Sequence, residues 1–283
     1  MITLKKRTAA IFFLWLIFTT TLFSTPISSI TIALGSEQGQ ISRNADNWTS
    51  LFFSIHEGNY YIPDYFSKCI QVFNQTGILQ HTIGSINAIN PRMRYFGIAS
   101  SSYLIIFSDN TLYCLNINGQ ILWNMPFPLG LMPQSFLCGP ESLFILFSIN
   151  NEYRTLAIPY ATADKAVMLP TPTLRDTITM PSGITFAWQQ EFTQAHTDPS
   201  SVYSILKLGQ QDNSFWIAQN VYKPVTVAKI RAEDGNQVFL HLAEAIDTTS
   251  WFTLDFEEVD KQTFVHVLTI EADVLRISKY SFE

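Results

Sequence analysis

Hydrophobic and polar positions alternate over short runs along most of this chain. Between residues 51 and 83, turn-forming residues separate four such runs, and these are Leu51–Ile55, Asn59–Pro63, Cys69–Asn74 and Ile78–Ile83. Short alternating runs with tight turns between them predict an antiparallel meander of four strands. Because one meander cannot cover both of its faces, further copies of the unit are expected along the chain.

A second copy spans residues 94–131, and it reads RYFGIASSSYLIIFSDNTLYCLNINGQILWNMPFPLGL. Gly77 and Gly119 occupy matching turns 42 residues apart, and Asn74 aligns with Asn116. A four-strand unit that repeats at about 40–45 residues is typical of a propeller blade. The two glycines are predicted to supply a positive φ in the turn between the third and fourth strands.

The two ends of the chain complement each other. Ile30–Leu34 is predicted to be a lone outer strand, and three strands are expected near Trp251–Phe256, Phe264–Thr269 and Val274–Ser281. Together they would make one blade, with Ile30–Leu34 beside the last strand, which closes the ring and removes its exposed edges. The fold class is therefore predicted as an all-β propeller of four-stranded blades.

The number of blades follows from the length of the chain. The stretch from Gly35 to the end holds about 250 residues, which at about 42 residues per blade gives six blades. The middle of the chain keeps only the strand rhythm, with Asp234-Gly235-Asn236 as a hairpin turn, so five blades stay open as an alternative.

The segment Ile62–Gly77, IPDYFSKCIQVFNQTG, resembles the NHL-type propeller repeat, which has an apolar-Ala-Asp start, a short loop and an Ile-x-Val-Phe-Asp-x-x-Gly end. The matching positions are Gly58 in the preceding turn, Asp64, Ile70, Val72, Phe73 and Gly77. The departures are Ser67, Cys69 and Asn74. The second copy, ending in GQILW, is more similar to the quinoprotein-like repeat. The resemblance implies a six-bladed, TolB-like class of propeller in which Asp64 binds turn amides, and it implies no particular activity.

The N-terminus carries a targeting pattern. Lys5, Lys6 and Arg7 precede an apolar run over Ala9–Phe18, and small and polar residues follow. This order is typical of a secretory signal, so residues 1–29 are predicted as a signal peptide and 30–283 as a single propeller domain. An uncleaved signal anchor is the open alternative, and it would be the chain's one contact with a membrane. The protein is thus expected to be exported, whether periplasmic, secreted or surface-tethered.

Composition excludes some classes of partner. The net charge is −6 and the body of the chain has no basic cluster, so nucleic acid is not expected as a partner. Three cysteines, Cys69, Cys114 and Cys138, exclude a dense disulfide framework. They are interpreted as buried small hydrophobic residues, with one disulfide and a spare thiol as the alternative.

Candidate chemistry is sparse. Asp255 and Glu257 would point to one face of a strand, as two Ca²⁺ ligands could, but they lack the spacing of a Ca²⁺-binding loop, and a solvated strand end is the default interpretation. The five histidines have no metal-binding spacing and are interpreted as structural or surface residues. No catalytic residue and no cofactor-binding residue is predicted, and Ca²⁺ or Zn²⁺ stays open.

These observations favour a non-catalytic, protein-binding propeller in the cell envelope or outside the cell. Partner contacts are expected on loops of one face, such as residues 84–94 and 193–200. Two alternatives remain: a Ca²⁺- or Zn²⁺-dependent hydrolase or lyase of the lactonase type, and a sensor of small ligands or carbohydrates.

Overall fold

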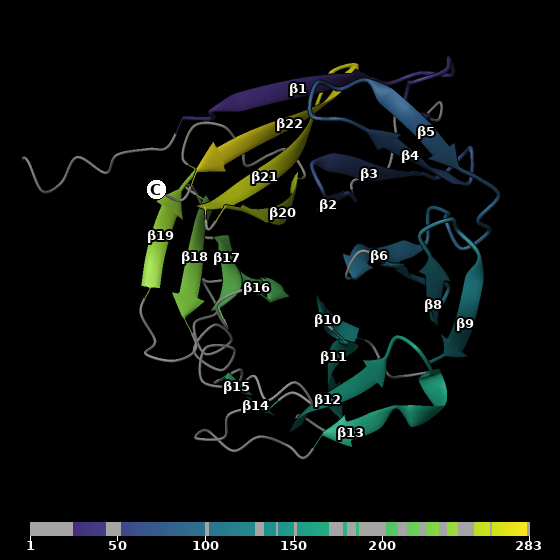
Figure 1. The fold of residues 1–283 in the computed structure, drawn as a ribbon, viewed down its shortest axis with the longest axis vertical. Helices are drawn as coiled ribbons and strands as arrows, with labels where there is room; N and C mark the ends of the chain where they lie inside the picture. The colour runs from purple at the N-terminus through teal and green to yellow at the C-terminus, as the bar shows by residue number, and fades with distance from the viewer. Residues whose placement is uncertain are drawn as a thin grey trace, which may run out of the picture.

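The computed structural model describes residues 25–43, 52–99, 102–127, 133–139, 141–149, 152–169, 178–179, 185–186, 202–208, 214–220, 225–231, 237–242, 252–260 and 262–281. Within them, the strands form five four-stranded antiparallel sheets and one two-stranded pair. The sheets are arranged as the blades of a propeller around a central axis (Figure 1). The predicted all-β propeller fold is therefore confirmed.

The first three blades are consecutive meanders. The first blade consists of β2 (Ser54–His56), β3 (Asn59–Asp64), β4 (Cys69–Phe73) and β5 (Leu79–Ile83). The second consists of β6 (Met93–Ala99), β7 (Tyr103–Ser108), β8 (Thr111–Asn116) and β9 (Ile121–Pro126). The third consists of β10 (Pro133–Cys138), β11 (Ser142–Ile149), β12 (Glu152–Pro159) and β13 (Val167–Leu169), with a short 3-10 helix, η2 (Ala163–Lys165), before β13.

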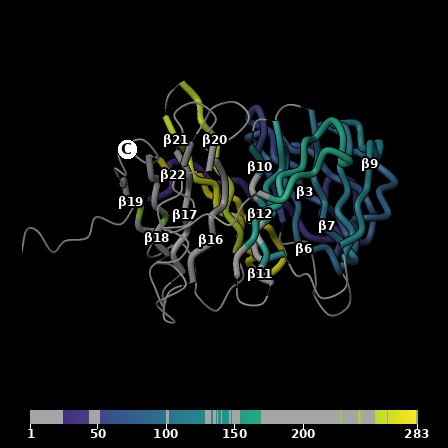
Figure 2. Tube along the Cα trace, turned by 90° about the horizontal axis from the view of Figure 1, so that it is seen from below, coloured from purple at the N-terminus to yellow at the C-terminus, as the bar shows by residue number. Residues whose placement is uncertain are grey.

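The second half of the chain begins with a two-stranded pair, β14 (Ile178–Thr179) and β15 (Thr185–Phe186). The next blade consists of β16 (Val202–Leu208), β17 (Ser214–Asn220), β18 (Val225–Arg231) and β19 (Gln237–His241). The last blade combines both ends of the chain, in the order β1 (Ser28–Ala33), β22 (Val274–Ser281), β21 (Gln262–Glu271) and β20 (Phe252–Val259). Figure 2 shows the first three blades and the last one side by side in one layer.

The prediction of six four-stranded blades is not met in the described residues, which form five. The innermost strands contact one another in the order β2, β6, β10, β16, β20 and back to β2, so no further inner strand separates β10 from β16. The predicted number assumed that every stretch of about 42 residues forms a four-stranded blade. The stretch between β13 and β16 contributes only the pair β14–β15 to the described part, and the rest of it lies outside.

The predicted pairing of the two ends is confirmed. β1 pairs antiparallel with β22, with Ile30 opposite Ile277 and Ser28 opposite Lys279. The pairing extends one residue further, because the Ile27 N–H donates to the Lys279 carbonyl at 2.8 Å. The strand thus begins at Ser28, two residues before the predicted start of the domain. Residues 1–24, most of the predicted leader, lie outside the described residues, and no described helix is long and apolar enough to cross a membrane.

The turns and bulges of the first two blades repeat at an interval of 42 residues. Gly77 and Gly119 have φ values of +78° and +84°, and their N–H groups donate to the carbonyls of Asn74 and Asn116. Both blades also have a bulge at the same place, at Gln80 of β5 opposite Val72 and Phe73 and at Leu122 of β9 opposite Cys114 and Leu115. Gly58 has a φ of +71° in the turn between β2 and β3. Gly235 lies outside the described residues.

Hydrophobic clusters fill the junctions between blades. Ile32, Leu275 and Ile277 of the last blade pack with Ile62 and Phe73 of the first. Similar clusters join the first blade to the second and the second to the third. This packing explains why the inner strands are apolar on both faces, because each blade is covered on both sides.

All three cysteines are in the reduced thiol form. Cys69 and Cys114 are buried, as predicted, whereas Cys138 is half-buried. Burial is the main reason that the pKa of Cys69 is raised to about 11 and that of Cys114 to about 12. No disulfide joins any of the three.

Candidate functional site

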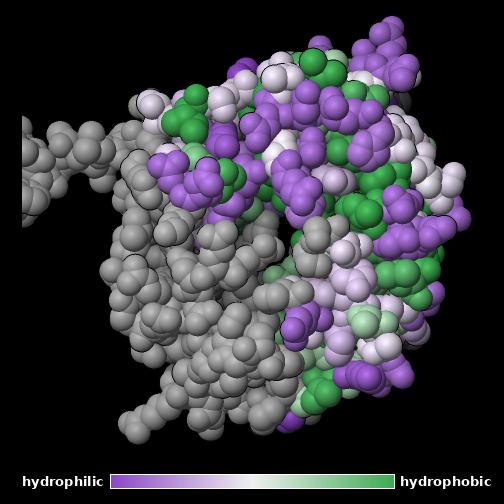
Figure 3. All heavy atoms as spheres, in the orientation of Figure 1, coloured by the Kyte–Doolittle hydropathy of each residue, from purple (hydrophilic) through white to green (hydrophobic). Residues whose placement is uncertain are grey.

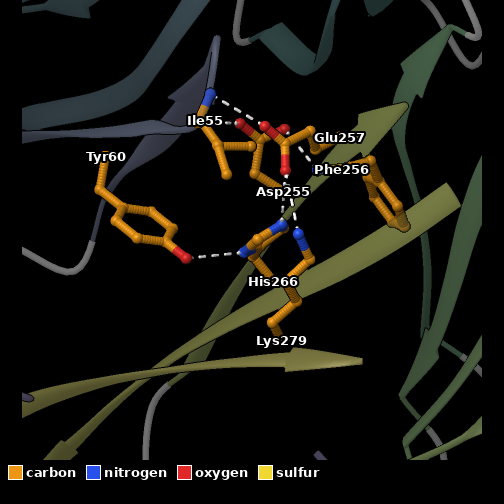
Figure 4. A network of polar contacts seen from close by, with 8 residues as sticks. Ile55, Tyr60, Asp255, Phe256, Glu257, His266 and Lys279 are labelled. Carbon is orange, nitrogen blue, oxygen red and sulfur yellow. Dashed lines mark hydrogen bonds and ion pairs between the residues drawn. The ribbon is translucent and has the colours of Figure 1, made fainter. Parts of the chain in front are cut away.

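The acidic residues singled out in the sequence lie where the last blade meets the first. Asp255 and Glu257 are on β20, the innermost strand of the last blade, and both accept hydrogen bonds from the first blade. We call this junction the blade seam. It is formed by Ser54, Ile55, Gly58 and Tyr60 of the first blade and Asp255, Glu257, His266 and Lys279 of the last. Figure 4 shows Ile55 and Tyr60 facing the side chains of the last blade.

Strand register explains why the polar residues of the last blade gather on one face. Asp255 on β20 is opposite His266 on β21, which in turn is opposite Lys279 on β22. Directly opposite residues in neighbouring antiparallel strands point to the same side of a sheet. Glu257 follows Asp255 by two positions and therefore shares that side. The four side chains form a polar row that faces the first blade.

Asp255 is 8% exposed and connects the inner strands. Its Oδ2 accepts 2.7 Å hydrogen bonds from the Ser54 hydroxyl and from the Ile55 N–H. Because β2 is an innermost strand with a free edge, the Ile55 N–H would be left without a partner in a buried position if the carboxylate were absent. The Ser54 hydroxyl also accepts from the Ile98 N–H at 3.3 Å, so this contact reaches the second blade.

The buried carboxylate of Glu257 contacts three partners. Its Oε1 accepts from the Gly58 N–H at 2.9 Å, and its Oε2 lies 3.4 Å from Lys279 Nζ and 3.5 Å from His266 Nε2. Burial alone would raise the pKa of Glu257, but the neighbouring His266 and Lys279 outweigh it and hold the pKa below its usual range. The Lys279 ammonium also lies 3.9 Å from the centre of the Phe264 ring, a cation–π contact.

His266 is fully buried and faces Tyr60 across the seam. Its Nδ1 is 3.1 Å from the Tyr60 hydroxyl, and the two rings meet edge to face with centroids 5.5 Å apart. Burial, with a further effect of the Glu257 carboxylate, raises the pKa of Tyr60 to about 12, so the phenol keeps its proton. Burial also lowers the pKa of His266, although the Glu257 carboxylate acts in the opposite direction.

These contacts indicate which ring nitrogen of His266 carries the proton. In a neutral ring, Nδ1 can accept the proton of the Tyr60 hydroxyl while Nε2–H points toward Glu257. The contact between Nε2 and Glu257 is electrostatic, since Nε2 makes no hydrogen bond of good geometry. The seam therefore holds one ion pair, Glu257 with Lys279, beside a neutral histidine and a neutral tyrosine.

The structure corrects the default interpretation of Asp255 and Glu257 as a solvated strand end. Both carboxylates are largely buried, because the first blade covers the face to which they point. Their oxygens are held by backbone N–H groups, a serine and a lysine, which are structural partners. In the described part of the chain, no group of three or more His, Cys, Asp or Glu side chains could hold a metal ion. Their proposed role as metal ligands remains a prediction.

Asp64 has a role of the kind that the repeat resemblance implies. It is fully buried, and its Oδ1 accepts from the backbone N–H groups of Phe66 and Ser67 at 3.2 and 3.1 Å. Its Oδ2 accepts from the Ser42 N–H, the Ser42 hydroxyl and Gln71 Nε2, at 3.1, 2.9 and 3.0 Å. One carboxylate thus joins the segment after β1 to the β3–β4 turn and to β4.

Sequence reasoning missed most of the blade seam. Ser54, Tyr60 and Lys279 carry no motif, and nothing along the chain pairs Ser54 and Tyr60 with partners some 200 positions away. One signal was present: His266 interrupts the apolar run Phe264-Val265-His266-Val267-Leu268 at an inward position. A histidine there must find a polar partner in the core.

The junction between the second and third blades differs in character. Tyr95 stacks on Phe136, and the Tyr95 hydroxyl contacts Cys138 Sγ at 3.2 Å. The Tyr160 carbonyl accepts from Trp123 Nε1 at 2.7 Å. These contacts join aromatic rings and neutral polar groups.

The first loop proposed for partner contacts is partly built into the core. Ile86, Ala88 and Ile89 are buried between the first and second blades. Arg92 is exposed, and it pairs with Asp109 of the second blade at 3.1 Å. The second loop, residues 193–200, lies outside the described residues.

Comparisons with known proteins give the fold. No family model and no curated protein matches the chain. A member of the DUF4221 family from Bacteroides vulgatus is 10% identical over 91% of this chain and 97% of its own, with a TM-score of 0.51. The major Malassezia sympodialis allergen Mala s 1 is 8% identical over 82% of this chain and 92% of its own, with a TM-score of 0.50. At such low identity, these similarities show the fold alone.

Proposed function

We propose that this protein is an exported, non-catalytic propeller that binds another protein. The main support for this proposal is that the buried acidic and imidazole side chains take part in contacts between blades. Asp255, Glu257 and His266 are the groups that a metal-dependent hydrolase would need at its axis, and here they bind the first blade and Lys279. Such groups stabilise a scaffold.

The proposed contact surface is the circumference of the ring rather than the loops of one face. Large hydrophobic side chains are exposed on or beside the outermost strands of three consecutive blades, and they are Ile78, Ile121, Leu122, Val167 and Met168. In Figure 3, hydrophobic side chains gather at the margin near β8 and β9, whereas hydrophilic ones cover the last and first blades. Exposed apolar side chains grouped in this way are typical of interaction surfaces.

Export rests on the N-terminal sequence, and the fold is compatible with it. We propose that the leader is removed before Ser28, which would leave β1 free to pair with β22. The order of the inner strands supports a ring of five blades that β1 completes. The protein would then act as a rigid body in the envelope or outside the cell.

The test begins with the full chain produced in a host with a secretory pathway. Mature protein in the exported fraction, with an N-terminus at or just before Ser28, is the result expected for export. Crosslinking in the native organism should then capture a partner with the wild-type chain and lose it with Ile121→Asp/Leu122→Asp. Gln80→Asp, a polar exposed position on β5, is the matched control and should retain the partner.

Two results would contradict the proposal. Retention of the intact leader with the chain in the cytoplasm would contradict export. One tightly held Ca²⁺ or Zn²⁺ per chain, together with turnover of a lactone or ester, would instead support the hydrolase alternative.

A further inference from the structure

The described blade junctions differ in how they respond to protons. Among the described residues, the buried acidic and imidazole side chains that join a strand of the first blade to a strand of the last are Asp255, Glu257 and His266, and all of them lie at the blade seam. The junction of the second and third blades is made by aromatic stacking and neutral hydrogen bonds. A fall in pH would therefore act on one junction before the others.

We infer that the blade seam is an acid-sensitive latch, at which protonation of the cluster around His266 and Glu257 releases the last blade from the first while the other blades stay folded. This inference is independent of the proposed function. It rests on the geometry of the seam, where one largely buried ion pair lies beside one fully buried neutral imidazole.

The charged and titratable groups around His266 come from each element packed against it. β3 contributes Tyr60, β20 contributes Asp255 and Glu257, and β22 contributes Lys279. β2 and the turn after it contribute the Ser54 hydroxyl and the Ile55 and Gly58 N–H groups, and His56 and Glu57 in that turn face each other at 3.7 Å. A proton added to Glu257 would neutralise the carboxylate that pairs with Lys279. A proton added to His266 would place a second positive charge beside Lys279.

Protonation of His266 and protonation of Glu257 both weaken the blade seam. The pKa of His266 lies below its ordinary value of 6.5, so the open state binds a proton more readily, and the seam weakens as the pH falls below 6.5. The pKa of Glu257 lies below its ordinary value of 4.5, so its contribution is present above 4.5 and is lost as the pH falls further. The seam is thus strongest at neutral pH and weakens in two steps.

The experiment is hydrogen exchange on the full chain at pH 7.5 and 5.5, with protection factors corrected for the intrinsic exchange rate. The Ile55 and Gly58 amides report on the seam, because they donate to Asp255 and Glu257. At pH 5.5, one unit below the ordinary pKa of a histidine, we expect the protection factors of these two amides to fall by up to about tenfold. Amides of β7 and β8, inside the second blade, should keep theirs.

A double variant assigns the effect to the histidine. Tyr60→Phe/His266→Phe replaces both members of the hydrogen bond with apolar rings, and its seam protection should be the same at pH 7.5 and 5.5. His81→Phe, an exposed histidine on β5, is the matched control and should keep the wild-type profile. If the double variant does not fold, the wild-type comparison of seam and second-blade amides still decides. Equal protection at both pH values, or a parallel loss in β7 and β8, would overturn the inference.

Discussion

At the scale of single residues, buried carboxylates and special backbone conformations decide how neighbouring segments join. Asp64 holds two turn amides, Ser42 and Gln71 at once, and Asp255 satisfies the free edge of β2. Neither residue has an opposite charge as its main partner. Each of these buried carboxylates accepts several hydrogen bonds at once and so holds separate segments together.

The Asp64 contacts predict a large loss of stability on truncation. Asp64→Ala removes the acceptor of one buried and four partly buried hydrogen bonds, and it should lower the free energy of unfolding by about 3 kcal/mol. Asp64→Asn keeps the shape and part of the bonding, so it should cost less. Urea denaturation of both variants measures the difference. An Asp64→Ala variant as stable as the wild type would contradict the role assigned to this residue.

The two repeat glycines predict a second effect. Gly77→Ala and Gly119→Ala each place a side chain at positive φ, which should cost about 1 kcal/mol. Gly119 should cost more, because the new Cβ would lie 2.6 Å from Ile83 Cγ2. Gly84→Ala is the control, since no atom lies within 4 Å of its Cβ position and the change should be near neutral. Thermal unfolding of the three variants gives the comparison, and equal losses at all three positions would exclude the backbone explanation.

At the scale of elements, β1 is the strand whose position is least expected from local sequence. It is short and alternates in burial, and its partner β22 lies almost at the other end of the chain. Ile32 is 2% exposed and packs with Leu275 and Ile277, so the strand contributes to the hydrophobic cluster between the last and first blades.

Substitution in β1 tests this contribution. Ile32→Ala should lower the free energy of unfolding by about 3 kcal/mol, as expected for a core isoleucine. Ile27→Ala, one residue before the strand and 58% exposed, should change it little. Both values can be measured by chemical denaturation of chains that start at the same residue. A negligible effect of Ile32→Ala would mean that β1 is not packed in the last blade in solution.

At the scale of the whole molecule, the described junctions among the first three blades are mainly apolar, whereas the blade seam contains an ion pair. The blade seam joins the ends of the chain, and its buried ion pair and neutral histidine give it a pH dependence that the aromatic junctions lack. Four of the five blades are local meanders, whereas the last blade takes β1 from the other end of the chain and the seam depends on contacts across some 200 residues.

The folded ring also protects the thiols. The pKa of Cys69 is raised from 9.0 to about 11, which at a given pH leaves about a hundredfold less of the reactive thiolate. In native protein at pH 8, Cys69 and Cys114 should therefore resist iodoacetamide, and the half-buried Cys138 should react first. Mass spectrometry of timed samples gives the order, and unfolded protein is the control in which all three react. Rapid native modification of Cys69 would contradict the buried site.

By itself, the sequence determined the meander units, their period and the positions of their turns. These features depend on residues close together in the chain: the alternation of β4 and β8, the asparagines and the glycines at positive φ. It also determined that the two ends share a blade, because a lone strand at the start matched three strands at the end.

Only the tertiary structure decided which faces are buried and which polar groups meet. Asp255 and Glu257 look like a solvated strand end along the chain, and they become buried because another blade covers them. The number of four-stranded blades likewise depends on contacts between β10 and β16 that no period in the sequence shows. The physical reason is that hydrogen bonding within a meander is local, whereas burial and charge pairing depend on which blades become neighbours when the ring forms.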